Sequence, residues 1–205
     1  PDPRLTELER IVAPEKTLPA IVEFVDIAGL VAGASKGEGL GNKFLANIRE
    51  TDAIMHVVRC FSDDNVVHVS GKINPLSDIE TINTELILAD METLEKAIQK
   101  ESKKAKSGDK DAINLLNIYK KVEETFNDGE LAINLGLDED EHSLLKPLCL
   151  ITIKPIMFLA NVDENGFTNN DLLDKLATYA KNINVPVVAV SAKIESDIAE
   201  LENDE

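Results

Sequence analysis

The apolar residues of the chain fall into two kinds of pattern. Short continuous apolar runs occur at four places, 20–26, 53–60, 155–160 and 186–190. Runs without alternation are typical of strands that are buried on both faces of a parallel sheet. Apolar residues at helical spacing predict helices among these runs, at 42–50, 171–182 and 194–201. The pattern therefore predicts an α/β fold, a three-layer sheet with helices on both faces.

The middle of the chain has a different pattern, because its strand signal disappears from about 79 to 148. One helical face there carries Ile82, Leu86, Ala89 and Thr93, and another carries Ala112, Leu115, Leu116, Tyr119, Val122 and Phe126. Ser107-Gly108-Asp109 breaks the pattern between the two. We expect an antiparallel coiled-coil hairpin at 79–148, closed by a third helix near 138–148. It would be an insertion into an α/β domain made of 1–78 and 149–205.

Composition excludes several classes of function. The net charge of -17 repels nucleic acid at long range, so a DNA partner is not expected. No apolar run reaches the roughly 18 residues that cross a bilayer, so no membrane role is expected either. Cys60 and Cys149 lie in apolar runs without CxxC spacing, which favours buried, reduced thiols in the cytoplasm.

The tip of the predicted hairpin reverses the overall charge. Between 100 and 110 the chain has five lysines against two acidic residues, a local charge of +3. A solvated turn that lysines keep soluble explains this cluster. A contact with RNA phosphates is the alternative, and its candidate residues are Lys103, Lys104 and Lys106. Both explanations stay open at this point.

Three short motifs follow three of the predicted strands. They are Asp26-Ile-Ala-Gly29, Asn161-Val162-Asp163-Glu164 and Ser191-Ala192-Lys193. Ligands of open α/β sheets bind at the carboxyl ends of the strands, so the three motifs could surround one nucleotide. The Asp26 carboxylate can hold Mg²⁺ through a water molecule, and Gly29 lets a backbone N–H approach a terminal phosphate.

The order of these motifs resembles the P-loop GTPase superfamily. The run "VEFVDIAGLVAGASKGEGLGNKFLANIRETDAIMHVVRCF" at 22–61, together with "NVDE" at 161–164, resembles the YchF subfamily of Obg-like proteins, and the likeness extends over essentially the whole chain. The resemblance implies a Rossmann-like P-loop fold and a cytoplasmic ATPase that uses ATP and Mg²⁺. It also implies a ribosome partner, through a large-subunit or RNA contact that switches with nucleotide state.

The base motif departs from the usual guanine reader, Asn-Lys-x-Asp. Val162 takes the lysine position and Glu164 the acid position, and the added methylene shifts both carboxylate oxygens beyond hydrogen-bond tolerance. We expect guanine preference to be lost. The resemblance implies that Asn161 and the Val162 main chain lie near an adenine, while Ser191 and Ala192 brace the loop. On its own, 161–164 could also be a polar exit from a strand.

No catalytic residue is assigned. Leu30 stands where many relatives carry a water-orienting glutamine, and a leucine cannot orient water. His56 lies inside an apolar run, which favours a structural histidine over a general base. The glycines between 33 and 41 resemble a switch loop, and a flexible turn before the helix at 42–50 is the alternative.

No Gly-Lys-Ser/Thr occurs anywhere in the 205 residues. Members of the resembled family start with a strand, a Walker A loop and a first switch, and they end with a small β-rich domain. We therefore expect the chain alone to be an internal fragment with poor nucleotide affinity and almost no turnover. The family's first strand would lie between 20–26 and 53–60. Two further functions stay open, a non-catalytic scaffold that presents the hairpin and a GTP-specific switch.

Overall fold

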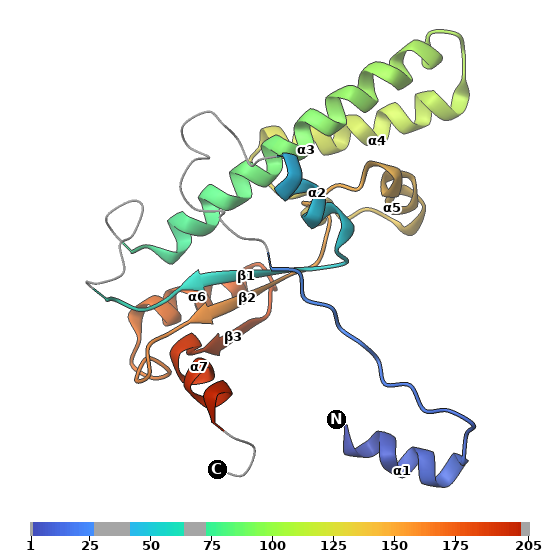
Figure 1. The fold of residues 1–205 in the computed structure, drawn as a ribbon. Helices are drawn as coiled ribbons and strands as arrows, with labels where there is room; N and C mark the ends of the chain where they lie inside the picture. The colour runs from blue at the N-terminus through green and yellow to red at the C-terminus, as the bar shows by residue number, and fades with distance from the viewer. Residues whose placement is uncertain (1, 27–41, 64–72, 202–205) are drawn as a thin grey trace.

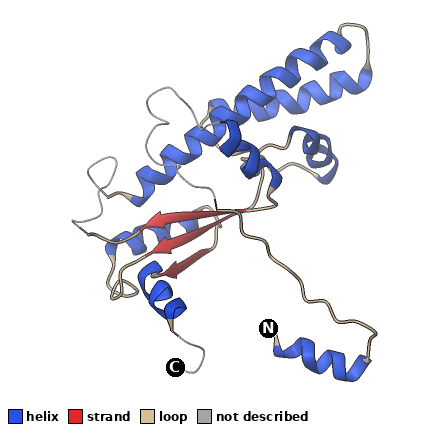
Figure 2. Ribbon diagram, viewed as in Figure 1, coloured by secondary structure: helices blue, strands red, loops and turns tan. Residues whose placement is uncertain are grey.

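A three-stranded parallel sheet forms the centre of the computed structural model, which describes residues 2–26, 42–63 and 73–201, without the side chains of 42–44. Its strands lie in the order β1 (Ile54–Arg59), β2 (Ile156–Asn161) and β3 (Val187–Val190), labelled in Figure 1 and drawn as red arrows in Figure 2. His56 lies opposite Phe158, and Phe158 lies opposite Val187. The α/β fold class and three of the predicted strands are confirmed.

Helices account for most of the remaining described chain. The α-helices are α1 (Pro3–Val12), α2 (Asn42–Glu50), α3 (Pro75–Ala105), α4 (Lys110–Asn127), α5 (Glu139–Leu145), α6 (Asp171–Asn182) and α7 (Ala192–Glu200). Two short 3₁₀ segments, η2 (Ala132–Leu135) and η3 (Lys146–Leu148), flank α5. Polar side chains cap the first turns of several helices. Asp109 accepts hydrogen bonds from backbone N–H groups of α4, and Asp138 forms a capping box with Glu141 at α5.

Two helices cover one face of the sheet. Ile79 of α3 and Leu176 of α6 are fully buried against Val58 and Phe158, which point to that face. The opposite face is different. Met55, Val57 and Val188 point there and stay 39–58% exposed, so within the described chain the expected second helical layer does not bury them.

The predicted strand at 20–26 is wrong for this structure. Residues 20–26 are extended but belong to no strand, and Ile21 and Phe24 are 88% and 74% exposed. An extended segment becomes a strand only when a neighbour satisfies its backbone groups. β1 pairs with β2, and no described strand lies beside 20–26. In Figure 1 this segment and α1 run away from the sheet.

Helix α3 belongs to both parts of the molecule. Its first turns pack on the sheet through Ile79, and its later turns pack along α4 through Leu94 (Figure 1). Leu94, Ile118, Val122, Phe126 and Leu145 form the core of this second part. Gly108, at φ +87°, makes the turn between α3 and α4, where the left-handed backbone favours glycine. None of the described helices is both long and apolar enough to cross a bilayer.

A buried polar junction ties α2 to α3 and to the segment after η3. Asp90 of α3 is completely buried, and one of its oxygens accepts from Arg49 Nη1 at 3.1 Å. Its other oxygen accepts from both the backbone N and Oγ1 of Thr152 at 2.8 Å. Lys154 donates to the carbonyls of Ile48, Arg49 and Thr51 at the end of α2. Three segments distant in sequence therefore share one hydrogen-bond network.

Replacing Asp90 with alanine should lower the free energy of unfolding by about 3 kcal/mol or more. The change removes the only described carboxylate that pairs with Arg49 and the acceptor of the buried Thr152 N–H. Glu92→Ala on the same helix is the matched control, because Glu92 pairs with Lys96 in solvent and should cost at most about 1 kcal/mol. Urea unfolding measures both, and equal losses would contradict a structural role for the junction.

Candidate nucleotide-base site

Asn161 at the end of β2 is half-buried, and Val162 at the start of the following loop is buried. Asn161 ends the strand, and its carbonyl accepts from Cys60 N at 2.7 Å. Val162 is only 2% exposed, and its side chain joins the core beside Phe158. The Val162 N–H donates to the Val190 carbonyl at 2.9 Å. Any main-chain contact between Val162 and a base therefore has to come from its carbonyl oxygen.

The Asn161 side chain connects this loop to the start of α7. Its Oδ1 accepts from the backbone N of Ala192 at 3.1 Å. Ser191 is 1% exposed and caps the same helix, with its Oγ accepting from Ile194 N at 3.5 Å. The structure thus brings Asn161, Val162, Ser191 and Ala192 together at the carboxyl edge of the sheet.

Glu164 and Lys193 form an ion pair across the same two loops. Glu164 Oε1 lies 2.6 Å from Lys193 Nζ, and the two side chains are 47% and 72% exposed. The hydrogen bond that Lys193 donates to Glu164 raises the pKa of Lys193, with smaller contributions from the charges of Glu164, Asp197 and Asp63. Sequence reasoning found Glu164 but gave Lys193 no contact, although Lys193 is the last residue of the Ser-Ala-Lys motif.

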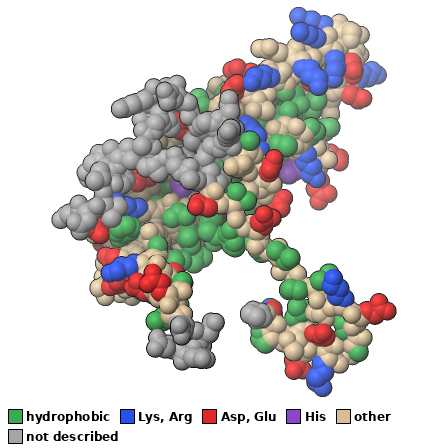
Figure 3. All heavy atoms as spheres, in the orientation of Figure 1, with side chains coloured by type: hydrophobic (Ala, Val, Ile, Leu, Met, Phe, Trp, Pro, Cys, Tyr) green, Lys and Arg blue, Asp and Glu red, His purple; other side chains and the backbone are tan. Residues whose placement is uncertain are grey.

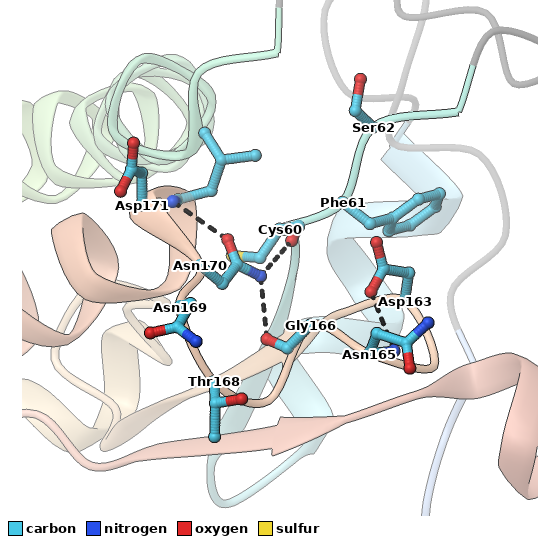
Figure 4. Close-up of a pocket in the computed structure, with 11 residues that line it drawn as sticks. Cys60, Phe61, Ser62, Asp163, Asn165, Gly166, Thr168, Asn169, Asn170 and Asp171 are labelled. Carbon is cyan, nitrogen blue, oxygen red and sulfur yellow. Dashed lines mark hydrogen bonds between the residues drawn. The ribbon is translucent and has the colours of Figure 1, made fainter.

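Asn170 holds the rest of the loop in place, and sequence reasoning missed it. Its Nδ2 donates to the carbonyls of Cys60 at 2.8 Å and Gly166 at 3.0 Å, while its Oδ1 caps α6 (Figure 4). Position 166 favours glycine, because a Cβ atom there would lie only 2.7 Å from Asp163 Oδ1. The role of Asn170 could have been predicted from its position just before a helical pattern, because asparagine favours the N-cap of a helix.

A cavity of about 390 Å³ opens beside this loop, at the carboxyl ends of β1 and β2. It is lined by Cys60, Phe61, Ser62, Asp163, Asn165, Gly166, Thr168, Asn169, Asn170, Asp171 and Leu172. Figure 4 shows the Phe61 ring beside Asp163, and the Arg59 guanidinium lies 4.6 Å from the ring centre. An aromatic ring next to amide and carboxylate groups suits a planar heterocycle with polar edges.

The phosphate-sensing motif is not brought to this edge by the described residues. Gly29, Leu30 and the glycines from 33 to 41 lie outside the described chain. Asp26 is exposed, and within the described ranges no hydrogen bond joins it to Asn161. The described residues also contain no cluster of three or more metal-ligating side chains.

His56 and the two thiols are assigned no role in the site, although Cys60 lines the cavity and its backbone bonds Asn161 and Asn170. The His56 ring packs against Phe158 with centroids 5.7 Å apart, and burial lowers the pKa of His56 to about 4. Burial also raises the pKa of the Cys60 thiol to about 11. The expectation of a buried Cys149 is wrong, because this residue is exposed at a left-handed turn with φ 48°.

The lysines of the hairpin tip lie at the far end of α3. Lys103 and Lys106 are exposed, and Figure 3 shows blue side chains gathered at that end. Lys104 is half exposed and donates to Glu101 Oε1 at 2.9 Å. Within the described part of the chain Lys103 and Lys106 form no ion pair, whereas Lys104 is already engaged by a carboxylate.

The chain matches a known family of GTPases. The sequence profile described as "50S ribosome-binding GTPase" matches residues 5–121, which is more than half of the chain. The chain belongs to this family. The base loop at 161–164 and the start of α7 lie beyond the matched region, so their assignment depends on the geometry above and on the individual relatives.

The relatives within this GTPase family are YchF proteins. The ribosome-binding ATPase YchF of Pasteurella multocida is 57% identical over 205 residues, all of this chain and 56% of the relative. That of Bacillus subtilis is 54% identical over 208 residues, or 57% of the relative. The structure of the Schizosaccharomyces pombe YchF GTPase matches with a TM-score of 0.80 and 30% identity, over 100% of this chain and 57% of that chain. The predicted YchF kinship is confirmed, and the chain spans little more than half of these relatives.

Acid should destabilise this family member through His56. Its pKa is about 4 when folded against 6.5 unfolded, so the unfolded chain binds more protons between these values. The free energy of unfolding should fall as pH drops from 6.5 to 4, by no more than about 3 kcal/mol. The His56→Gln variant should lack this fall in the free energy of unfolding when denaturant unfolding is measured across that pH range. His142→Gln, which alters an exposed histidine, should keep it; an unchanged slope in both would contradict the assignment.

Proposed function

We propose that the chain is the nucleotide-binding part of a ribosome-associated ATPase, with the base held at the carboxyl edge of the sheet. The observation that carries this proposal is the hydrogen bond from Ala192 N to Asn161 Oδ1, which holds the two motif loops beside each other. The relatives named ribosome-binding ATPases support the reaction class. The aromatic and amide lining of the neighbouring cavity supports a planar ligand.

The base should be adenine rather than guanine. The valine at the lysine position of the guanine motif is buried, so its side chain cannot cover a base. Glu164, at the acid position, carries an extra methylene and is already paired with Lys193. Asn161 and the Val162 carbonyl are then the groups of the 161–164 loop nearest an adenine, with Ser191 and Ala192 bracing that loop. GTP would bind less well than ATP.

The phosphate end of the ligand is assigned to the first motif. Asp26 would hold Mg²⁺ through a water molecule, and Gly29 would offer a backbone N–H to the γ-phosphate. Mg²⁺ supplies charge neutralisation of the phosphate oxygens when it is bound. We assign no side chain as catalytic base, because His56 is packed against Phe158 and favours its neutral form through burial.

The hairpin is proposed as the part that contacts the ribosome. Its tip is basic within an acidic protein, and Lys103 and Lys106 are exposed there, with Lys104 beside them. Lysines at phosphate groups release counterions, which gives affinity without base specificity. Helix α2 follows the glycine-rich segment and is bonded to α3 at Asp90. A change of nucleotide state would therefore shift the position of the hairpin through α2. A ribosome partner places the protein in the cytoplasm.

Replacing Asn161 with alanine should weaken ATP binding about tenfold, because one change removes a base contact and the acceptor of the Ala192 N–H. Binding is measured by titration of fluorescent ATP into protein made from the full reading frame. Asn134→Ala is the control, since Asn134 bonds Glu130 away from the site and should leave ATP affinity unchanged. Equal ATP affinity in wild type and Asn161→Ala would remove the proposed base site.

Reversing the tip charges should weaken ribosome association. Lys103→Glu with Lys106→Glu should lower the affinity several-fold and reduce the log–log salt slope by about 1.5, since each lost phosphate contact removes about 0.7–0.9. Co-sedimentation with ribosomes over a salt series measures both quantities. Lys175→Glu with Lys181→Glu makes the same charge change on α6 and serves as control. A loss shared by both double variants would reflect net charge instead of a tip contact.

A further inference from the structure

The ion pair between Glu164 and Lys193 joins two loops whose backbones are fixed independently. On one side, Val162 N bonds Val190 O at 2.9 Å and Gly166 N bonds Asp163 O at 3.0 Å, so Glu164 lies between two anchored residues. On the other side, Lys193 lies in the first turn of α7, where Ala192 N bonds Asn161. Both side chains therefore reach each other from rigid supports, next to the proposed base contact.

The surroundings keep Lys193 charged. Besides Glu164 at 2.6 Å, the acidic residues Asp197 and Asp63 face it. An ammonium group has three donors and no acceptor, whereas a carboxylate only accepts. The pair therefore presents one donor and one acceptor side by side at the edge of the site.

This combination suits one purine better than the other. Adenine offers an acceptor, N1, next to a donor, its N6 amino group. Guanine offers donors at both N1 and N2, and it needs a carboxylate with both oxygens available. In this structure one oxygen of Glu164 already accepts from Lys193.

We propose that Lys193 is a specificity-determining residue, which disfavours guanine by occupying Glu164 and favours adenine by supplying a donor. This inference rests on the proposed function, because it requires a purine at the 161–164 loop. It adds a cause of base choice that is separate from the longer side chain of Glu164. Neutralising Lys193 should shift the choice of base even though Glu164 itself is unchanged.

The expected size of the effect follows from the exposure of the pair. Exposed ion pairs are weak and are screened by salt. Removing Lys193 should therefore lower the ratio of ATP to GTP affinity by roughly twofold to fivefold.

The test is a double-mutant cycle on protein made from the full reading frame, with ATP and GTP affinities measured by competition against one fluorescent nucleotide. Lys193→Met, which keeps the length of the side chain, should lower the ratio of ATP to GTP affinity. Lys193→Arg, which retains the positive charge, should leave this ratio unchanged. In a Glu164→Gln background, Lys193→Met should lower the ratio by a smaller factor, because only the donor to adenine is then lost. Lys181→Met removes a lysine from the far end of α6 and controls for net charge.

Salt gives a second readout that a purely structural role would not move. Raising the ionic strength to about 1 M should shift the wild-type ratio toward that of Lys193→Met, because the Debye length falls to about 3 Å. The ratio of Lys193→Met should stay constant. If wild type binds neither nucleotide, the proposed function itself fails. If wild type prefers ATP but Lys193→Met keeps the same ratio, only the role of Lys193 is overturned.

Discussion

The burial of the Asp90 carboxylate is the constraint on which the arrangement of the helices depends. A fully buried charge costs several kcal/mol unless it is paired and hydrogen-bonded. Asp90 has no exposed surface, and it takes its partners from α2 through Arg49 and from the segment after η3 through Thr152. If either segment left α3, the buried carboxylate would lose the partners of one of its two oxygens. The helix that follows the glycine-rich motif is thereby bonded to the helix that forms the hairpin.

Much of the fold could be predicted because strands and helices leave a local pattern. The runs at 53–60, 155–160 and 186–190 form β1, β2 and β3, and the helical spacing locates α2, α6 and α7. The run at 20–26 has the same pattern and yet forms no strand. Pairing depends on a neighbour, and the residues of a strand do not encode whether that neighbour is present. Helix α3 begins at Pro75, before the predicted 79, because proline suits the first helical turn.

The candidate site was predictable where it depends on strand ends and unpredictable where it depends on distant partners. Asn161 and Ser191 follow strands, so their meeting at one edge follows from parallel topology. Asn170 bonds Cys60 across 110 residues of sequence, and Asp90 meets Thr152 across 62. Lys193 belongs to a visible motif, but its contact with Glu164 requires the actual spacing of two loops. Such pairings follow from tertiary packing, which no local pattern records.

Helix α3 runs unbroken for 31 residues from the sheet to the hairpin tip, and this continuity limits how the two parts can move. At 1.5 Å per residue it is about 46 Å long, so any tilt of about five degrees at the sheet would move the tip by roughly 4 Å. A separate hinge between sheet and hairpin would have to break this helix. If α3 pivots at the sheet, where Ile79 is buried, the lysine-rich end moves furthest, and the bond between Asp90 and α2 lies about halfway along the arm.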